Sequence, residues 1–345
     1  MADRKTNLMP QTLLIPILNR HLNLILIKMG MIDVGDKPES QRSATAQAVL
    51  EFDNSIYDVI KNGNSPKGNI FEIARLAGTM GAKKTFDLIP YCHPIPIDSI
   101  TVDTTIESNR LKIEVSVKSV WNTGVEMEAL TGATIAALSV YDILKPLKRS
   151  LYINSIKLLE KKGGVDDFKE VFKDNLYAVV LTISDSRNKD QDKSGKLIID
   201  KLNKYGFTIV DYKIIHDELE AIERELRIFS DEKKVDVIIT TGGTGAGPRD
   251  VTPEATKKSL DRELSGIVEN LRHYGQRRTP LSMLSRGVAG IRGNTLIINM
   301  PGSTLAVSQS LDALFPGIMH IFKVVSGHTH NHHHHYNSHN GKTTL

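Results

Sequence analysis

A chain of 345 residues exceeds one average domain, and a prior of about 150 residues per domain predicts two. Apolar residues make up 40% of the chain and charged residues 24%, which is ordinary for a soluble globular protein and excludes extensive disorder. Aromatic residues are only 6%, and the net charge of +4 is spread along the chain, so neither base stacking nor a basic stripe indicates nucleic-acid binding. The single cysteine, Cys92, cannot form an internal disulfide, which predicts a reducing, cytoplasmic location.

The first 30 residues include an apolar stretch, residues 13–27, whose composition is similar to that of a membrane segment. Pro16 and Arg20 are among the residues that interrupt it, and a spanning helix needs about 18 or more consecutive apolar residues. No small-residue cleavage site follows the stretch, which argues against a signal peptide. We therefore expect an irregular leader and no membrane segment. Alternatively, the start codon is placed upstream of the true start at Met29 or Met31.

Residues 31–167 are predicted to form one domain of mixed helices and strands. Polar residues Glu107–Arg110 separate two β-rich runs, which predicts a hairpin. A long Ala- and Leu-rich helix ends at Pro146, which cannot continue it. Because helices and strands do not alternate regularly, we expect an α+β fold. The predicted helices are Ser40–Lys61, Gly68–Lys83 and Ala129–Lys145, and the predicted strands are Ile97–Ile106 and Leu111–Val120.

Low apolar density and clustered charges predict a linker at residues 168–176. Strands and helices then alternate over residues 177–326, which predicts an α/β three-layer domain with a mostly parallel sheet and helices on both faces. The predicted strands are Tyr177–Ser184, Thr208–Ile215, Val235–Thr240 and Thr295–Met300, and the predicted helices lie near Ser194–Tyr205, Glu218–Ser230 and Thr304–Val325.

Residues 327–345 form a tail that contains seven of the twelve histidines. Such a tail can bind nickel, zinc or copper. No second type of ligand fixes a coordination geometry, so we expect a disordered tail without a designated metal.

The segment Pro90–Pro96 presents Cys92 and His93 from a backbone that prolines hold extended. Neighbouring residues of an extended chain point to opposite faces, so the two side chains are not expected to form a nucleophilic pair. A metal site would need more ligands than the chain offers. A structural role for His93 remains the alternative to a catalytic one.

Four charged residues lie at the two ends of the predicted helix that follows. Glu126 and Glu128 share a face if the segment leading into this helix is extended, and lie about 200° apart if it is helical. Asp142 and Lys145 are neighbours on the helix, and a surface ion pair is the alternative to a catalytic role. A straight helix places Glu128 about 20 Å from Asp142, which predicts a site assembled across a subunit interface.

The motifs of this first domain resemble the cyclic pyranopterin monophosphate synthase family, MoaC. That family forms hexamers with sites at dimer interfaces. We expect the α+β fold of this domain to be of the ferredoxin-like kind. It converts a cyclised dihydro-GTP to cyclic pyranopterin monophosphate and releases pyrophosphate. The resemblance rests on Lys67–Asn69, Asp87–Pro94, Gly124–Thr131 and Tyr141–Lys145.

The resemblance implies roles for individual residues. Asp142 and Lys145 are expected to exchange protons, while His93 and Lys67 hold the triphosphate or shuttle protons. Glu126 and Glu128 are expected to position the pterin. The expected substrate-binding residues are Tyr91, Cys92, Met127, Arg42 and Lys161. Two positions depart from the family: Tyr91 replaces the usual Leu, and Gly163–Asp167 replaces a GGKSG-like stretch and removes a positive charge near the anionic ligand.

In the second domain, a Gly-rich turn follows the buried strand Val235–Thr240. Its backbone N–H groups can face an anion, although it lacks the GK[ST] of a Walker loop and a plain tight turn is the alternative. Thr252 as N-cap and Pro253 fit a helix that starts behind it. Asp217 and Asp250 follow predicted strands at the carboxyl edge of the sheet, where they can hold magnesium and a nucleotide.

The second domain resembles the MogA and MoaB molybdopterin-binding family. The matching stretches are Thr182–Ser186, Thr241–Gly245, Asp250–Glu254, Leu284–Arg286 and Asn299–Ser303. Active members form trimers and transfer AMP from ATP to molybdopterin with magnesium, and Asp217 and Asp250 match their catalytic aspartates. The expected substrate-binding residues are Ser184, Gly242, Gly243, Thr244, Gly245, Pro301, Gly302 and Ser303.

Together the resemblances imply a bifunctional enzyme of molybdenum cofactor biosynthesis, whose small-molecule partners are a cyclised dihydro-GTP, molybdopterin and ATP. No nucleic acid and no membrane is expected as a partner. A homo-oligomer with three-fold symmetry accommodates a hexameric and a trimeric domain. The alternative is a synthase fused to a non-catalytic molybdopterin-binding scaffold, because Pro301–Ser303 are more similar to the MoaB branch.

Overall fold

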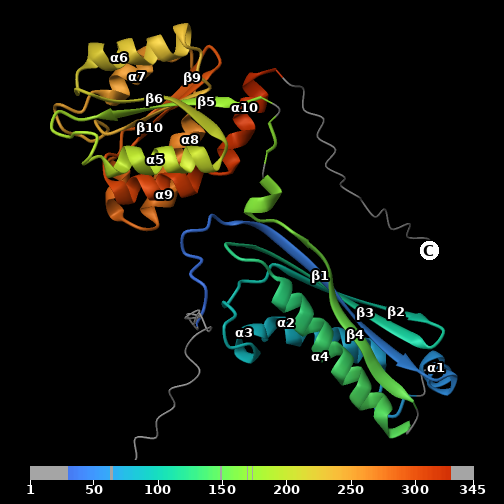
Figure 1. Cartoon of the computed structure of the whole chain (residues 1–345). Coiled ribbons are helices and arrows are strands. Elements are labelled where there is room, and N and C mark those ends of the chain that lie inside the picture. The colour runs from blue at the N-terminus through green and yellow to red at the C-terminus, as the bar shows by residue number, and fades with distance from the viewer. Residues whose placement is uncertain (1–29, 63–64, 148–149, 169, 173, 328–345) are drawn as a thin grey trace, which may run out of the picture.

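The computed structural model describes residues 30–62, 65–147, 150–168, 170–172 and 174–327, which form two domains (Figure 1). Nearly all of the predicted leader and of the His-rich tail lies outside these residues. Each domain has its own hydrophobic core. The first core is built from residues between Ala44 and Leu144, and the second domain has two clusters of buried side chains between Ala178 and Phe322.

The first domain is a four-stranded sheet with two long helices packed against it. The strands are β1 (Ser40–Phe52), β2 (Ser99–Glu107), β3 (Arg110–Trp121) and β4 (Leu151–Lys162), in the order β2-β3-β1-β4. All neighbouring strands are antiparallel. The helices are α1 (Asn54–Lys61), α2 (Ile70–Lys83), α3 (Thr85–Leu88) and α4 (Glu126–Leu144). Helices and strands are mixed without regular alternation, so the α+β prediction holds.

The prediction of a helix over Ser40–Lys61 is wrong for its first part. Residues 40–52 form the central strand β1, and only residues 54–61 are helical, behind the N-cap Asp53. From Ala44 to Ala48 every second residue is buried against the helices, while Thr45 and Gln47 lie on the other face. Period-2 alternation is the signature of a half-buried strand, but alanines supply the buried positions and have a high helix propensity.

The edge strand β4 was not predicted. Half-buried and exposed residues alternate only over its first half, and its second half is exposed throughout. Helix α4 begins at Glu126, three residues before the predicted start at Ala129, and it has no side-chain N-cap bond that would mark this start. The hairpin between β2 and β3 and helix α2 are found close to where they were predicted.

The second domain is a six-stranded sheet between two layers of helices, as Figure 1 shows. Its strand order is β6-β5-β7-β10-β9-β8, and the first four strands are parallel. The strands are β5 (Leu176–Ile183), β6 (Phe207–Ile215), β7 (Val237–Thr241), β8 (Arg262–Glu263), β9 (Ala289–Arg292) and β10 (Thr295–Met300). The mostly parallel sheet confirms the α/β prediction, whereas β8 and β9 were not predicted.

Helices cover both faces of this sheet. One layer contains α6 (Leu219–Arg227) and α7 (Thr252–Ser259), and the other contains α5 (Lys193–Lys204), α8 (Ser265–Gln276), α9 (Thr304–Leu314) and α10 (His320–Val325). Helix α8 was not predicted. The single helix predicted over Thr304–Val325 is broken after Leu314, because Pro316 lacks an N–H and cannot continue a helix. Thr252 is the first residue of α7 and not its N-cap, which is Val251.

The segment predicted as a linker is attached to the second domain. Glu170 accepts hydrogen bonds from Lys323 and from His320, at 2.7 Å for the His320 ring, and both bonds lower the pKa of Glu170. The ring of Phe172 contacts the ring of Phe322 edge-on at 6.4 Å. The chain therefore docks on α10 before it enters β5.

Among the described residues, one helical stretch, Glu126–Leu147, has the length and composition of a membrane span, and the bent pair α9 and α10 passes the same test only if taken as one span. Most of the apolar side chains of α4 are buried against the sheet and α2. This helix is accordingly the core helix of its domain.

Candidate functional sites

The C-terminal end of α4 carries a cluster of three charged side chains. Asp142 accepts from Lys145 Nζ at 2.6 Å and from Lys67 Nζ at 2.8 Å. Lys67 comes from the loop before α2, whose first turn is capped by Asn69. The hydrogen bonds from Lys145 and from Lys67 lower the pKa of Asp142 to about 2, and the same contact raises the pKa of Lys145. The three predicted catalytic residues are thus together and charged.

The N-terminal end of α4 carries the two predicted glutamates. Both lie in the first helical turn, so of the two alternatives left open by the sequence the helical one is found. Glu126 is partly exposed and lies 3.4 Å from Lys161 Nζ. Glu128 is buried, and its Oε2 atom has no hydrogen-bond partner among the described residues. Burial raises the pKa of Glu128 to about 7, so its carboxyl group gains or loses a proton near neutral pH.

Arg42 and Cys92 belong to this same end of the helix. Arg42 is buried, donates to Trp121 O at 3.3 Å and faces Glu126 and Asp167. Its guanidinium lies so close to Gly164 that a Cβ atom there would come within 2.2 Å of it. Burial raises the pKa of the Cys92 thiol, and the charge of nearby Glu128 adds to the effect.

One chain does not bring these two groups together. Helix α4 is continuous from Glu126 to Leu144, so its rise keeps Glu128 about 20 Å from Asp142. The proline-containing loop between α3 and β2 carries Tyr91, which is exposed, and His93, which is partly buried. Met127, next to Glu128 in the sequence, is exposed. Within a single chain, the predicted synthase residues therefore form two half-sites.

In the second domain the Gly-rich turn follows β7 and approaches neighbouring chain segments closely. Gly242 and Gly243 have positive φ angles of 103° and 61°. A Cβ at Gly242 would lie 2.3 Å from Ile183 O, and one at Gly243 would lie 2.3 Å from Thr252 Oγ1 and 2.8 Å from Asp217 Oδ1. Only glycine fits both the backbone conformation and the space, so this turn holds Asp217 against the start of α7.

Three carboxylates gather around this turn. Asp217 accepts from Val251 N at 3.4 Å, and Asp250 Oδ2 accepts from Gly247 N at 2.8 Å. Asp185 accepts from Asp217 N at 3.3 Å and forms an ion pair with Arg249. Burial raises the pKa of Asp217, and the negative charges of Asp250 and Asp185 add to it.

Asp185 was not among the predicted site residues. It directly follows β5 and the predicted substrate residue Ser184, in the same way that Asp217 follows β6. The carboxyl end of a parallel strand was the signal that could have identified it. Ser184 Oγ accepts from Arg187 N at 3.2 Å and so shapes the turn.

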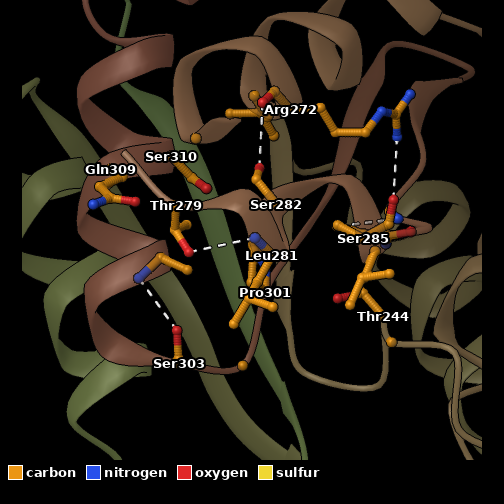
Figure 2. A pocket seen from close by; sticks show the side chains of 18 of the residues that line it. Thr244, Arg272, Thr279, Leu281, Ser282, Ser285, Pro301, Ser303, Gln309 and Ser310 are labelled. Carbon is orange, nitrogen blue, oxygen red and sulfur yellow. Dashed lines mark hydrogen bonds between the residues drawn. The ribbon is translucent and has the colours of Figure 1, made fainter. Parts of the chain in front are cut away.

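A cavity of about 550 Å³ opens beside the Gly-rich turn. Of the predicted residues, Gly243, Thr244, Gly245, Asp250, Pro301, Gly302 and Ser303 line it, whereas Ser184, Gly242 and Asp217 do not. Figure 2 shows Thr244, Pro301 and Ser303 around it, with Arg272, Thr279 and Ser282 on the opposing wall. That wall comes from α8 and the short 3-10 helix Pro280–Leu284. It was not predicted, because only its last residue, Leu284, belongs to a matched motif.

Arg286 fastens the loop that carries Asp250. Its guanidinium donates to Gly245 O at 2.6 Å, to the Asp250 carbonyl oxygen, and to Glu254. Its backbone N–H donates to Thr244 O at 2.9 Å. One side chain thus ties the loop between β7 and α7 to the segment that follows the 3-10 helix.

The described residues contain no group of three or more His, Cys, Asp or Glu side chains arranged to hold a metal ion. Magnesium, however, is usually bound through one or two carboxylates together with substrate phosphates. Asp217 and Asp250 fit that donor set, since their mutual repulsion, which contributes to the raised pKa of Asp217, would be relieved by a cation.

Comparisons with known proteins match both domains. Residues 31–164 match the MoaC family and residues 179–320 match the probable molybdopterin binding domain family. The chain is 36% identical over 315 residues to the molybdenum cofactor biosynthesis bifunctional protein of Synechococcus elongatus, which covers 87% of this chain and 98% of that protein. It is 34% identical over 302 residues to the protein of the same name from Chlorobaculum tepidum, covering 87% of this chain and 96% of that protein.

A shorter relative matches the first domain alone. The cyclic pyranopterin monophosphate synthase of Novosphingobium aromaticivorans is 42% identical over 134 residues, which is 39% of this chain and 85% of that protein. The two resemblances predicted from the motifs are confirmed, and they occur in series. The chain therefore belongs to the family of bifunctional molybdenum cofactor biosynthesis proteins, in which a MoaC domain precedes a molybdopterin-binding domain.

Proposed function

We propose that the first domain is a cyclic pyranopterin monophosphate synthase, which rearranges a cyclised dihydro-GTP and releases pyrophosphate. The cluster of Asp142, Lys145 and Lys67 supports this proposal, because the two ammonium groups can attract a polyphosphate and the carboxylate between them can relay protons. Formation of the cyclic phosphate requires that an oxygen of the substrate attacks the innermost phosphorus while pyrophosphate leaves.

The other end of α4 is suited to the pterin part of the substrate. Glu128 has a pKa of about 7 and a buried oxygen with no hydrogen-bond partner in the described part of the chain, so it can exchange a proton or a hydrogen bond with a ring nitrogen at neutral pH. Arg42 and Lys161 add positive charge close to Glu126 at the same end of the helix. His93 and Tyr91 present their side chains from the loop after α3.

We also propose that each synthase site is completed by a second chain. The separation of about 20 Å along α4 is too long for one small substrate to contact Glu128 and Asp142 of the same chain. A homo-oligomer with three-fold symmetry, built from such dimers, would accommodate both domains. We further propose that the first domain has a ferredoxin-like fold, which its strand order supports. We also propose a cytoplasmic location for the protein.

For the second domain we propose adenylyl transfer to molybdopterin. In that reaction a phosphate oxygen of molybdopterin attacks the α-phosphorus of ATP, and pyrophosphate leaves. The observation that carries the proposal is that Asp217 and Asp250 meet at the Gly-rich turn on the edge of the cavity of about 550 Å³. Asp217 and Asp250 would hold magnesium, which supplies neutralisation of phosphate charge when it is bound.

The cavity can hold the remaining parts of the ligands. Its lining combines apolar side chains such as Leu271 and Leu305 with hydroxyl groups of Thr244, Ser282 and Ser285. A few polar groups in a mostly apolar pocket are typical of small-molecule sites. The backbone N–H groups of the Gly-rich turn can bind a phosphate.

The test is to supply the purified protein with molybdopterin, ATP and magnesium and to measure adenylylated molybdopterin and pyrophosphate. Asp250→Asn is expected to lower AMP transfer by about 10²-fold to 10³-fold, since it removes a charge that acts on the reacting phosphate. Binding of molybdopterin should change much less. Tight binding without product in the unaltered protein would contradict the proposal and leave the second domain a carrier.

A further inference from the structure

A short segment in front of β1, residues 34–39, reaches across to the second domain. Tyr274 of α8 donates its hydroxyl to Asp36 O at 2.6 Å, and Arg277 forms an ion pair with Glu39 at 2.7 Å. Arg278 donates to Gly35 O, and its guanidinium stacks 3.5 Å from the centre of the Tyr274 ring. We name residues 34–39 the strap.

The strap is also fixed to the first domain. Asn122 donates its side-chain amide to Val34 O at 3.0 Å, and Val34 is buried. Lys37 N donates to Val34 O at 3.1 Å, which closes a turn that places Gly35 and Asp36 toward α8. Asn122 lies in the loop that leads directly into Glu126, at one of the two half-sites of the synthase.

On its other side, α8 is a wall of the cavity in the second domain. Leu271, Arg272 and Gly275 line the cavity, and each lies within one turn of Tyr274. Gly275 O accepts from Arg278 N and Thr279 N at 2.9 Å, and Ser282 Oγ donates to Arg272 O at 3.3 Å, so this end of α8 and the following 3-10 helix are joined (Figure 2). A shift of the helix end would alter both parts of that wall.

We infer that the strap positions the C-terminal end of α8 and thereby makes ligand affinity in the second domain depend on the first. The contacts carry this inference: Tyr274 is buried, so its hydroxyl needs the Asp36 carbonyl group, and Arg278 is held between that ring and the strap. On this inference, a ligand in the cavity and the docked strap both favour the same position of α8. Docking of the strap then strengthens ligand binding, and ligand binding strengthens docking of the strap by the same factor. The inference rests on the proposed function only in its choice of ligand.

The test uses charge exchange in the full-length protein. Arg277→Glu and Glu39→Arg each replace attraction by repulsion across the strap, and the double exchange restores the pair in reverse. Each single variant is expected to speed amide hydrogen exchange in residues 268–279 and to weaken molybdopterin binding by about three-fold to five-fold, the range of one exposed ion pair. Arg224→Glu on α6, with the same change of charge away from the strap, is the matched control.

The double variant should return both measurements to within about two-fold of the unaltered protein. Tyr274→Phe, which removes only the hydroxyl group, should act like the single charge variants. If the single variants leave exchange in α8 unchanged, or if the double variant fails to restore it, the inference is overturned. Hydrogen exchange separates this result from a failure of the proposed function, since a protein that binds no molybdopterin still reports whether the strap holds α8.

Discussion

The two domains place their functional residues in opposite ways. In the first, a helix of 19 residues carries one group of charged side chains at each end, and a single chain leaves them apart. In the second, parallel strands end at one edge of the sheet, and the loops that follow bring Asp185, Asp217 and Asp250 together within one chain. A parallel sheet collects residues at its carboxyl edge, whereas an antiparallel sheet under a long helix disperses them. On our proposal, the first site is therefore completed by a second chain, whereas the second site lies within one chain.

The largest expected effect comes from an experiment that asks whether a site is built from one chain or from two. Asp142→Asn and Glu128→Gln are each expected to lower synthase activity by about 10²-fold to 10⁴-fold, because each removes a group that can transfer a proton. When the two inactive proteins are mixed under conditions that allow subunit exchange, about half of the dimers should contain one chain of each variant. In each mixed dimer one of the two sites combines two unaltered half-sites, so about one quarter of the original activity should return. Pyrophosphate release measures it.

Recovery in the first domain should have no counterpart in the second. A mixture of Asp217→Asn and Asp250→Asn proteins should stay inactive in AMP transfer, because both aspartates belong to the same chain. Recovery of AMP transfer in this mixture, or no recovery of synthase activity in the other, would contradict the contrast between the two domains.

A smaller effect is expected from one methyl group at the Gly-rich turn. Gly243→Ala would place a Cβ within 3 Å of Thr252 and Asp217, whereas Gly293→Ala has nothing within 4 Å. Both glycines have positive φ angles, 61° and 56°, so the backbone strain is matched. We expect AMP transfer to fall by about 10²-fold for Gly243→Ala, through displacement of Asp217, and little for Gly293→Ala. Equal losses in the two variants would show that strain alone is responsible.

The smallest effect concerns stability and not activity. Glu128 has a pKa of about 7 in the folded chain, against 4.5 for an ordinary glutamate. The folded state binds this proton more tightly than the unfolded state. The free energy of unfolding therefore falls as the pH rises from 4.5 to about 7, and above about pH 7 it falls no further on account of this group. At about 1.4 kcal/mol per pKa unit, the loss is up to about 3 kcal/mol.

Glu128→Gln removes that proton equilibrium. The variant should therefore be more stable than the unaltered protein at about pH 8 and differ little from it at about pH 4.5. Denaturant unfolding of the first domain at both pH values measures the difference. An equal effect at both would mean that packing, and not ionisation, dominates at this position.

Sequence reasoning was most reliable where a motif coincides with fixed local geometry. Helix rise alone gave the separation of Glu128 from Asp142, and strand ends gave the positions of Asp217 and Asp250. It failed for Ser40–Phe52, because alternating alanines satisfy a strand while having helix propensity. Pairing with β3 and β4 on both sides decided the outcome there, and a tertiary contact of that kind leaves no local signal.

The cavity shows the same limit from another side. Its predicted residues came from Gly- and Pro-containing motifs, whereas the opposing wall consists of Leu271, Arg272 and Leu281, which belong to no motif. These side chains face the cavity only because α8 packs against both α9 and the 3-10 helix. The strap contact likewise joins residues more than 230 positions apart, as in the bond from Tyr274 to Asp36.

The docking of Glu170 and Phe172 on α10 has a practical consequence for dividing the chain. A second domain produced on its own from residue 177, the predicted start of its first strand, would lose Phe172 and its edge-on contact with the ring of Phe322. Lys323 would also lose its carboxylate partner. A fragment that begins at or before Glu170 keeps this outer layer, and it should be the more soluble and the more resistant to proteolysis of the two.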